Sequence, residues 1–138
     1  MAETQLTLTS AIIELFESGE VSELPFMSNS VFDVADGWTA KTIHQSDMRQ
    51  VMVGYGVEGY AVPCHNHKQT EYLFVMTGEF EVKTGDTKEA ACSNEKPRTI
   101  GRGETAHFPP LLWHEVRAVG KGDNILLAIQ EPPLSRTA

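Results

Sequence analysis

The stretch from Gly59 to Gly78 reads GYAVPCHNHKQTEYLFVMTG, and it holds two closely spaced histidines. His65 and His67 are two positions apart, so on an extended chain both imidazoles project from the same face, roughly 7 Å apart at the backbone. Two imidazoles at that spacing can converge on one ion with metal–nitrogen bonds of about 2.1 Å. The spacing therefore predicts a pair of metal ligands on a strand.

Two further side chains complete the predicted site. Glu71 follows His67 by four residues, which is about 13 Å on a continuous strand and too far to share an ion. A turn at residues 68–70 would fold the chain so that Glu71 enters on the neighbouring strand, on the face that the imidazoles use. His114 begins another strand after a proline-rich bend. We therefore expect a site of three nitrogens and one oxygen, made by His65, His67, Glu71 and His114.

From residue 30 onward, short segments rich in β-branched, aromatic and apolar residues alternate with glycine-rich turns. This spacing is typical of an all-β fold, either a closed barrel or a jelly roll. The predicted strands are Trp38 to Ile43, Arg49 to Tyr55, Glu71 to Met76, Glu79 to Thr84, Thr105 to Phe108, His114 to Val119 and Ile125 to Gln130.

The beginning of the chain has a different character, and residues 1–29 are expected to form a helical extension to a barrel domain of residues 30–138. Ser10 can cap a helix whose apolar positions, from Ile12 to Phe16, fall on one stripe, and Gly19 can end it. We expect this helix to pack on the outside of the barrel.

The glycines, histidines and glutamate of the opening stretch resemble the first motif of the cupin superfamily at every fixed position. That motif reads Gly59, five residues, His65, one residue, His67, three residues, Glu71, six residues and Gly78. A second stretch, with Gly103, Pro109 and His114, resembles the second cupin motif. It departs from the family pattern at Leu111, where the pattern has glycine, and at Ala118, where it often has asparagine.

The resemblance implies a cupin β-barrel with a short N-terminal α-helix, assembled as a homodimer. It also implies that His65, His67, Glu71 and His114 hold a metal ion, and that the protein is an enzyme acting on a small organic molecule. Dioxygenase chemistry at Fe(II) is the commonest analogue. Mixed imidazole and carboxylate ligation also suits Mn, Ni, Zn or Cu.

Other functions remain open at this stage. The same ion can act only as a Lewis acid, which would give an isomerase or a lyase. Related lyases use a tyrosine where this chain has Leu73. A third hypothesis is a non-catalytic module in which metal and ligand act as a sensor or plug. A polar cluster without metal is the remaining alternative.

Two residues are candidates for catalytic roles. Glu71 can accept a proton if its bond to the metal is loose. His107 can orient a ligand or act as a general acid or base if it points inward, and otherwise it is a partly exposed strand histidine. Arg49 can bind a substrate carboxylate if it faces the interior, although a solvated arginine is the simpler interpretation. By alternation, Cys64 and Tyr72 should face away from the metal.

Charge and composition exclude several classes of partner. The 138 residues carry 11 basic and 19 acidic side chains, a net charge of −8. This balance argues against nucleic acid and against anionic lipid, which both need a basic face. The longest purely apolar run, Ile125 to Ile129, is too short for a membrane span. Two cysteines and no apolar leader favour a reducing compartment, so a cytoplasmic protein is expected.

Overall fold

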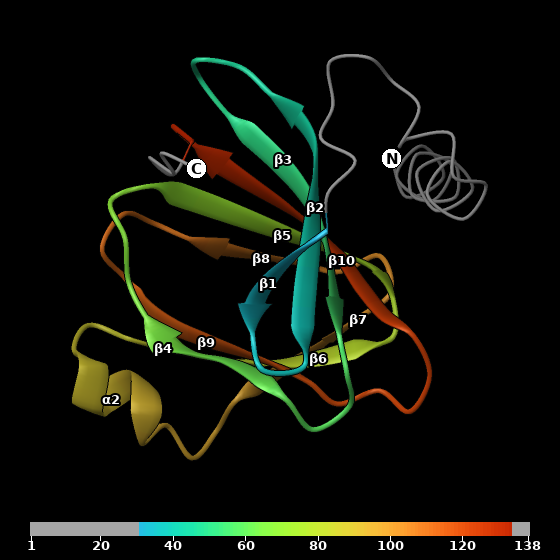
Figure 1. Cartoon of the computed structure of the whole chain (residues 1–138). Coiled ribbons are helices and arrows are strands. Elements are labelled where there is room, and N and C mark those ends of the chain that lie inside the picture. Colours follow the sequence, from blue (N-terminus) through green and yellow to red (C-terminus); the bar gives the residue numbers. More distant parts are fainter. Residues whose placement is uncertain (1–30, 134–138) are drawn as a thin grey trace.

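The computed structural model describes residues 31–133, and its strands form two antiparallel sheets that face one another (Figure 1). The predicted helical extension, residues 1–29, lies outside the described residues. The larger sheet has the order β1-β2-β3-β10-β5-β8, and the smaller has the order β4-β9-β6-β7. The predicted all-β jelly roll is therefore confirmed.

The bounds of the elements are as follows. The larger sheet consists of β1 (Phe32–Ala35), β2 (Trp38–Gln45), β3 (Gln50–Gly56), β10 (Asn124–Glu131), β5 (Thr70–Thr77) and β8 (Thr105–Phe108). The smaller sheet consists of β4 (Ala61–His65), β9 (Trp113–Ala118), β6 (Glu79–Gly85) and β7 (Arg98–Gly101). A short helix, α2 (Lys88–Cys92), follows β6 and begins at Thr87, whose side chain accepts a hydrogen bond from the Ala90 amide.

All seven predicted strands are present within one or two residues at each end, and the sequence missed β1, β4, β7 and α2. β4 contains Pro63, which cannot donate to a strand ladder. It forms an edge of the smaller sheet, where proline is tolerated. β7 is also an edge strand, and half of its four residues are exposed. Neither β4 nor β7 has the alternation of buried and exposed residues by which β8, also an edge strand, could be predicted.

Apolar side chains lie on both faces of the larger sheet. Between the sheets, Trp38 packs on Phe80 with ring centroids 5.6 Å apart, and most of the core residues surround this pair. The opposite face carries a second cluster around Val53, Met76 and Leu127. β10 is central in this sheet and is buried on both sides, which explains why its sequence reads as a continuous apolar run.

Within the described range, no helix is long and apolar enough to cross a membrane.

Candidate metal centre

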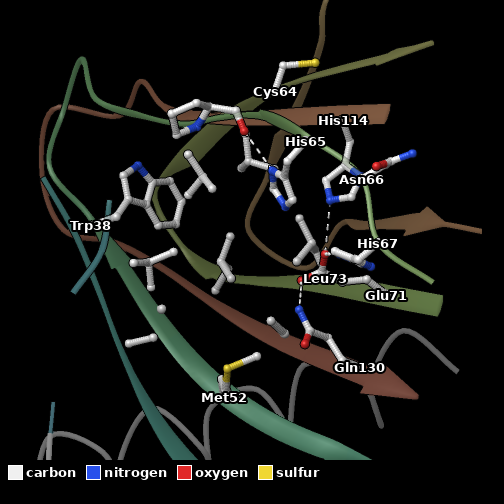
Figure 2. A pocket seen from close by; sticks show the side chains of 18 of the residues that line it. Trp38, Met52, Cys64, His65, Asn66, His67, Glu71, Leu73, His114 and Gln130 are labelled. Carbon is white, nitrogen blue, oxygen red and sulfur yellow. Dashed lines mark hydrogen bonds and ion pairs between the residues drawn. The ribbon is translucent and has the colours of Figure 1, made fainter. Parts of the chain in front are cut away.

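Three histidines meet at one end of the space between the sheets (Figure 2). His65 closes β4 and pairs with His114 of β9 in the β4–β9 register, so the two are direct cross-strand neighbours. His67 lies two residues beyond His65, in the connection to β5. One ring nitrogen of each histidine lies within 4.8 Å of those of the other two. The structure thus brings together all three of the predicted histidine ligands.

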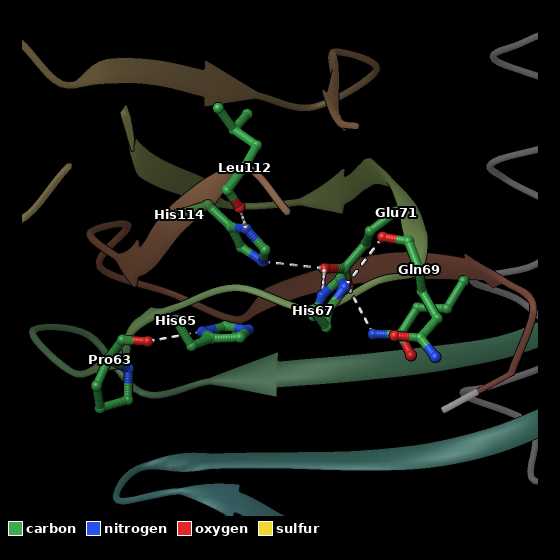
Figure 3. A network of polar contacts seen from close by, with 8 residues as sticks. Pro63, His65, His67, Gln69, Glu71, Leu112 and His114 are labelled. Atoms are coloured by element: carbon green, nitrogen blue, oxygen red, sulfur yellow. Dashed lines mark hydrogen bonds and ion pairs between the residues drawn. The ribbon is translucent and has the colours of Figure 1, made fainter. Parts of the chain in front are cut away.

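Each imidazole is held by a hydrogen bond from its Nδ1 to a nearby backbone carbonyl (Figure 3). The partners are Pro63 for His65 at 2.7 Å, Gln69 for His67 at 3.0 Å and Leu112 for His114 at 2.8 Å. A carbonyl accepts, so Nδ1 must carry the proton, and in the neutral ring the lone pair then lies on Nε2. The backbone therefore prepares three Nε2 atoms as ligands.

Glu71 enters from β5 on the opposite sheet, as the predicted turn at residues 68–70 requires. Its Oε1 lies 3.2 Å from Nε2 of His67 and 3.3 Å from Nε2 of His114. Its Oε2 accepts a hydrogen bond of 3.1 Å from Nε2 of Gln130 on β10. Burial raises the pKa of Glu71, but the contacts with His114, His67 and Gln130 outweigh burial and lower the pKa to about 2. The side chain is therefore a carboxylate.

The pKa values of two of the imidazoles are shifted in opposite directions. Burial lowers the pKa of His65 below its usual value and favours the neutral ring. The hydrogen bond with Glu71 raises the pKa of His67, because the carboxylate favours the protonated ring. A divalent cation placed beside Glu71 would supply the positive charge that the carboxylate otherwise gains from a protonated His67.

The geometry fits a metal ion. Two ligand atoms that are each about 2.1 Å from an ion, at a right angle, lie about 3.0 Å from one another. The separations of 3.2 and 3.3 Å between Glu71 and its two imidazoles are close to this value. Nε2 of His114 is fully buried, and no described residue gives it a hydrogen bond of acceptable geometry. A buried nitrogen of this kind needs a partner, and a cation would supply it.

The cluster lines one end of a cavity of about 490 Å³. Glu71, Gln130 and Asn66 contribute the other polar side chains of the lining, and the remaining walls are mostly apolar, with Trp38 and Leu73 among them (Figure 2). The volume falls in the range of small-molecule sites. The histidines therefore face a space that can admit a ligand.

The structure does not bring His107 to this site. On β8, Ala106 and Phe108 are buried, so His107 between them points outward, and it is exposed. Its ring stacks on Tyr72, with centroids 4.7 Å apart and an angle of 8° between the planes. The predicted acid–base role of His107 is therefore corrected, because its side chain lies on the opposite face of the sheet from the cavity.

The structure also places the other candidates away from the histidine cluster. Arg49 forms an ion pair of 2.8 Å with Glu131 near the surface and does not line the cavity. Sγ of Cys64 lies 4.0 Å from the carbonyl of Lys88 in α2 and points away from the imidazoles (Figure 2). Tyr72 faces outward, as the alternation with Glu71 predicts.

Sequence reasoning missed two features of the site. Gln130 is 5% exposed, and its hydrogen bond orients Glu71. The sequence carried a sign of this role, because Gln130 is a polar residue at the end of the apolar run of β10, at a position whose side chain points inward. Leu111 adopts a left-handed backbone with φ of 70°, and its amide donates a hydrogen bond of 2.8 Å to the carbonyl of His67. The glycine of the family pattern stands at this position because the turn needs that conformation.

Comparison with known proteins agrees with this geometry. The sequence pattern of the family described as Cupin domain matches residues 51–130. Similar solved structures include KdgF from a Halomonas species, with a TM-score of 0.65, 18% identity, and coverage of 79% of this chain and 95% of that one. An RmlC-like cupin from Shewanella frigidimarina has a TM-score of 0.63 and 17% identity over 77% of this chain and 86% of that one.

A third similar structure is the polyketide cyclase RemF from Streptomyces resistomycificus. It has a TM-score of 0.62 and 14% identity, and the match covers 75% of this chain and 70% of that one. No curated protein matches the sequence. At these identities the structures show the fold alone, whereas the family pattern spans more than half of the chain. This chain belongs to the cupin family.

Proposed function

We propose that this protein is a metal-dependent enzyme that acts on a small organic molecule, with one divalent transition metal ion held by His65, His67, Glu71 and His114. The observation that supports the proposal is the set of three Nε2 atoms, each fixed through Nδ1, at the end of a cavity of about 490 Å³. Structural metal sites are closed, whereas catalytic sites leave a coordination position open to solvent or substrate. Ligands that face a cavity of this volume favour the second kind.

Fe(II)-type dioxygenase chemistry is the more specific proposal. Three imidazoles and one carboxylate are ligands that suit Fe(II), and Mn, Ni, Zn and Cu remain alternatives. Such an ion supplies Lewis acidity toward a substrate oxygen or sulfur and, as iron, redox chemistry with dioxygen. The chain's own residues hold the imidazoles in the tautomer that leaves Nε2 free, and mostly apolar walls line the space beside them.

Glu71 fits the role of ligand better than that of proton acceptor. A carboxylate with a pKa of about 2 is a weak base near neutral pH. Gln130 donates to Oε2 and thereby leaves Oε1 directed at His67 and His114. We therefore propose that Glu71 completes the ligand set, and that any proton acceptance by Glu71 requires its release from the imidazoles.

A second candidate function is an isomerase, cyclase or lyase that uses the ion only as a Lewis acid. The similarity to a polyketide cyclase favours this alternative, although the match at 14% identity concerns the fold. The two candidates differ in oxygen consumption during turnover. A sensor without turnover is the third candidate, and it predicts that neither oxygen uptake nor any product is observed in the metal-loaded protein.

The metal site is tested by elemental analysis of the full chain purified without chelator and then loaded with Fe(II) or Zn(II). We expect one equivalent in the wild type and only a trace in His65→Ala. His107→Ala is the matched control, because this exposed histidine lies outside the cavity, and it should keep one equivalent. Retention of one equivalent by His65→Ala would refute the assigned site. An oxygen electrode then separates the dioxygenase from the alternatives.

A further inference from the structure

The walls of the cavity are apolar beyond the histidine end. Phe32, Trp38, Met52, Leu73, Val116 and Leu126 contribute to the lining from both sheets. The indole N–H of Trp38 already donates a hydrogen bond of 2.9 Å to the carbonyl of Tyr60, so the ring offers only its apolar surface to an occupant. Burial of apolar ligand surface against such walls is favourable.

No lysine or arginine within residues 31–133 lines the cavity. Arg49 is engaged by Glu131, and Arg117 donates to the carbonyl of Gly59 with 2.6 Å between the atoms. A carboxylate or phosphate that was buried against these walls would lose its hydration without gaining a cationic partner there. The walls therefore select against an anion, and only the histidine end can hold a charged or chelating group.

Gln130 adds one specific polar contact at that end. Its Nε2 donates to Glu71, and this interaction fixes the orientation of the amide, because a reversed amide would place oxygen against the carboxylate. Its Oε1 is buried, and no described residue donates a hydrogen bond to it. Gln130 lines the cavity, and a small rotation of its side chain would bring the unpaired Oε1, which is buried as the side chain stands, to a hydrogen-bond donor on an occupant.

We propose that the cavity binds an uncharged, largely hydrocarbon molecule of ring size that carries a hydroxyl group at one end, with that group accepted by Oε1 of Gln130 beside the histidine cluster. This inference rests on the proposed function in so far as the bound molecule is the substrate of that enzyme. The chemistry of the walls, however, is a property of this chain and does not depend on the identity of the ion.

A pair of matched probes tests the walls by calorimetry on the full chain near neutral pH. 2-Naphthol has the apolar rings and one hydroxyl group, and 6-hydroxy-2-naphthoate adds a carboxylate at the far end. In the metal-free protein, where no ion can bind the carboxylate, we expect 2-naphthol to bind at least about tenfold more tightly. Equal affinities in the metal-free protein, tighter binding of the carboxylate, or no binding of 2-naphthol would overturn the inference.

Two variants test which residues carry the selectivity. Val62 is half-buried in the lining, so Val62→Arg would place a cation at the cavity and should tighten the binding of 6-hydroxy-2-naphthoate about tenfold. Val57→Arg is the matched control, because Val57 is exposed and lies outside the lining. An equal effect of both variants would show that the carboxylate responds only to net charge, which contradicts the inference.

The role of Gln130 is tested by comparing 2-naphthol with naphthalene, which lacks the hydroxyl group. The wild type should prefer 2-naphthol, and Gln130→Met should lose most of that preference while it still binds naphthalene. An unchanged preference in Gln130→Met would assign the hydroxyl group to another residue. If the protein binds no metal but keeps its preference for 2-naphthol, the proposed function fails while the chemistry of the cavity stands.

Discussion

Nε2 of His114 and Oε1 of Glu71 lie 3.3 Å apart, and both side chains are almost completely buried. His114 belongs to β9 of the smaller sheet, and Glu71 belongs to β5 of the larger sheet. The pair therefore bridges the two sheets at the end of the cavity. An ion that bound both residues would tie the sheets together, and this arrangement has consequences for affinity and for stability.

Glu71→Gln should weaken metal binding by at least about 10- to 100-fold, the loss typical when only an outer partner of a ligand is removed, because it takes away a negative ligand and keeps the size of the side chain. The measurement is a competition titration with a chelator of known affinity. The control is Glu79→Gln, an exposed residue at the start of β6 that lies outside the cavity lining, which should leave the affinity unchanged. An unaltered affinity in Glu71→Gln would mean that the three histidines suffice to hold the ion.

Removal of the ion should lower the unfolding temperature. A ligand that binds only the folded state at 100 times its dissociation constant stabilises that state by about 2.7 kcal/mol. The proposed ligands come from both sheets, Glu71 from the larger and His65 and His114 from the smaller, so the bound ion should stabilise the whole described fold rather than one loop. Thermal unfolding with and without Zn(II) checks this, with His65→Ala as the variant that should show no shift on addition of Zn(II).

Leu111 should be replaceable by glycine with a gain in stability. The left-handed backbone at this position costs a non-glycine residue about 1–2 kcal/mol, and glycine avoids that cost. Part of the benefit, about 0.5–1 kcal/mol, is lost because glycine has more conformational freedom in the unfolded chain. Leu111 is 57% exposed, so little packing is lost. We expect Leu111→Gly to raise the free energy of unfolding by about 0.5–1 kcal/mol.

The matched substitution Leu111→Ile should act in the opposite direction, because β-branched residues are the least suited to positive φ. Urea unfolding measures both variants. The two hydrogen bonds that join Leu111 to residues 66 and 67 use only its backbone: its amide donates to the carbonyl of His67, and its carbonyl accepts from Nδ2 of Asn66. Metal content should therefore stay the same in both variants. A lower stability of Leu111→Gly would show that the leucine side chain contributes more than its exposure indicates.

The convergence of His65, His67 and Glu71 could be predicted from the sequence because local rules place them, whereas His114 was added through the resemblance to the second cupin motif. The spacing of His65 and His67 and the turn before Glu71 required only the period of a strand. The same alternation places His107 on the outer face, since Phe108 is buried against His114 with ring centroids 4.1 Å apart. The outward direction of His107 could thus have been inferred from Phe108, the large apolar residue that follows it in β8.

Other features depend on contacts between distant segments and could not be predicted from local patterns. Gln50, Gln130 and Glu71 lie side by side across β3, β10 and β5, but this row follows from a register that no single segment specifies. The left-handed turn at Leu111 is set by its bond to His67, 44 positions earlier in the sequence. Such features need the pairing of strands before they can be inferred.

A homodimer is expected from the family resemblance, and the structure shows which edges are available for it. Within residues 31–133 the larger sheet ends at β1 and β8, and the smaller ends at β4 and β7. Open edges present unpaired backbone groups that favour association. Sedimentation velocity at micromolar concentration should give about twice the 15.2 kDa of one chain. A mass of one chain would contradict the prediction.

Asn124 should be among the residues most important for stability. It is fully buried at the start of β10, and its Nδ2 donates to the carbonyls of Gly120 at 2.8 Å, Gly56 at 3.3 Å and Gly122 at 3.3 Å. Its Oδ1 accepts a hydrogen bond of 3.0 Å from the amide of Glu79. This side chain therefore joins the turn before β10 to the start of β6 and to the end of β3.

Asn124→Ala should lower the free energy of unfolding by about 3 kcal/mol, because an unsatisfied buried polar group costs about 1–3 kcal/mol and more than one would be left. Asn94→Ala is the matched control. The Nδ2 of Asn94 donates to the carbonyl of Thr84 at 3.3 Å, and its Oδ1 accepts from the amide of Lys96 at 2.9 Å, an exposed residue whose amide can bind water instead. The loss should be about 1 kcal/mol.

Asn124 also explains Gly78, the last fixed position of the first motif. A Cβ on Gly78 would clash with Oδ1 of Asn124, and it would lie 2.6 Å from the carbonyl oxygen of Asp123. Gly78 also has a φ of 85°. Gly78→Ala should therefore destabilise the wild type, and somewhat less so the Asn124→Ala background, where the clash with Oδ1 is removed but the backbone contacts at positions 123 and 124 and the positive φ remain. Urea unfolding of the two single variants and the double variant measures this coupling. Additive effects in that cycle would show that the clash with Asn124 is not what requires glycine at this position.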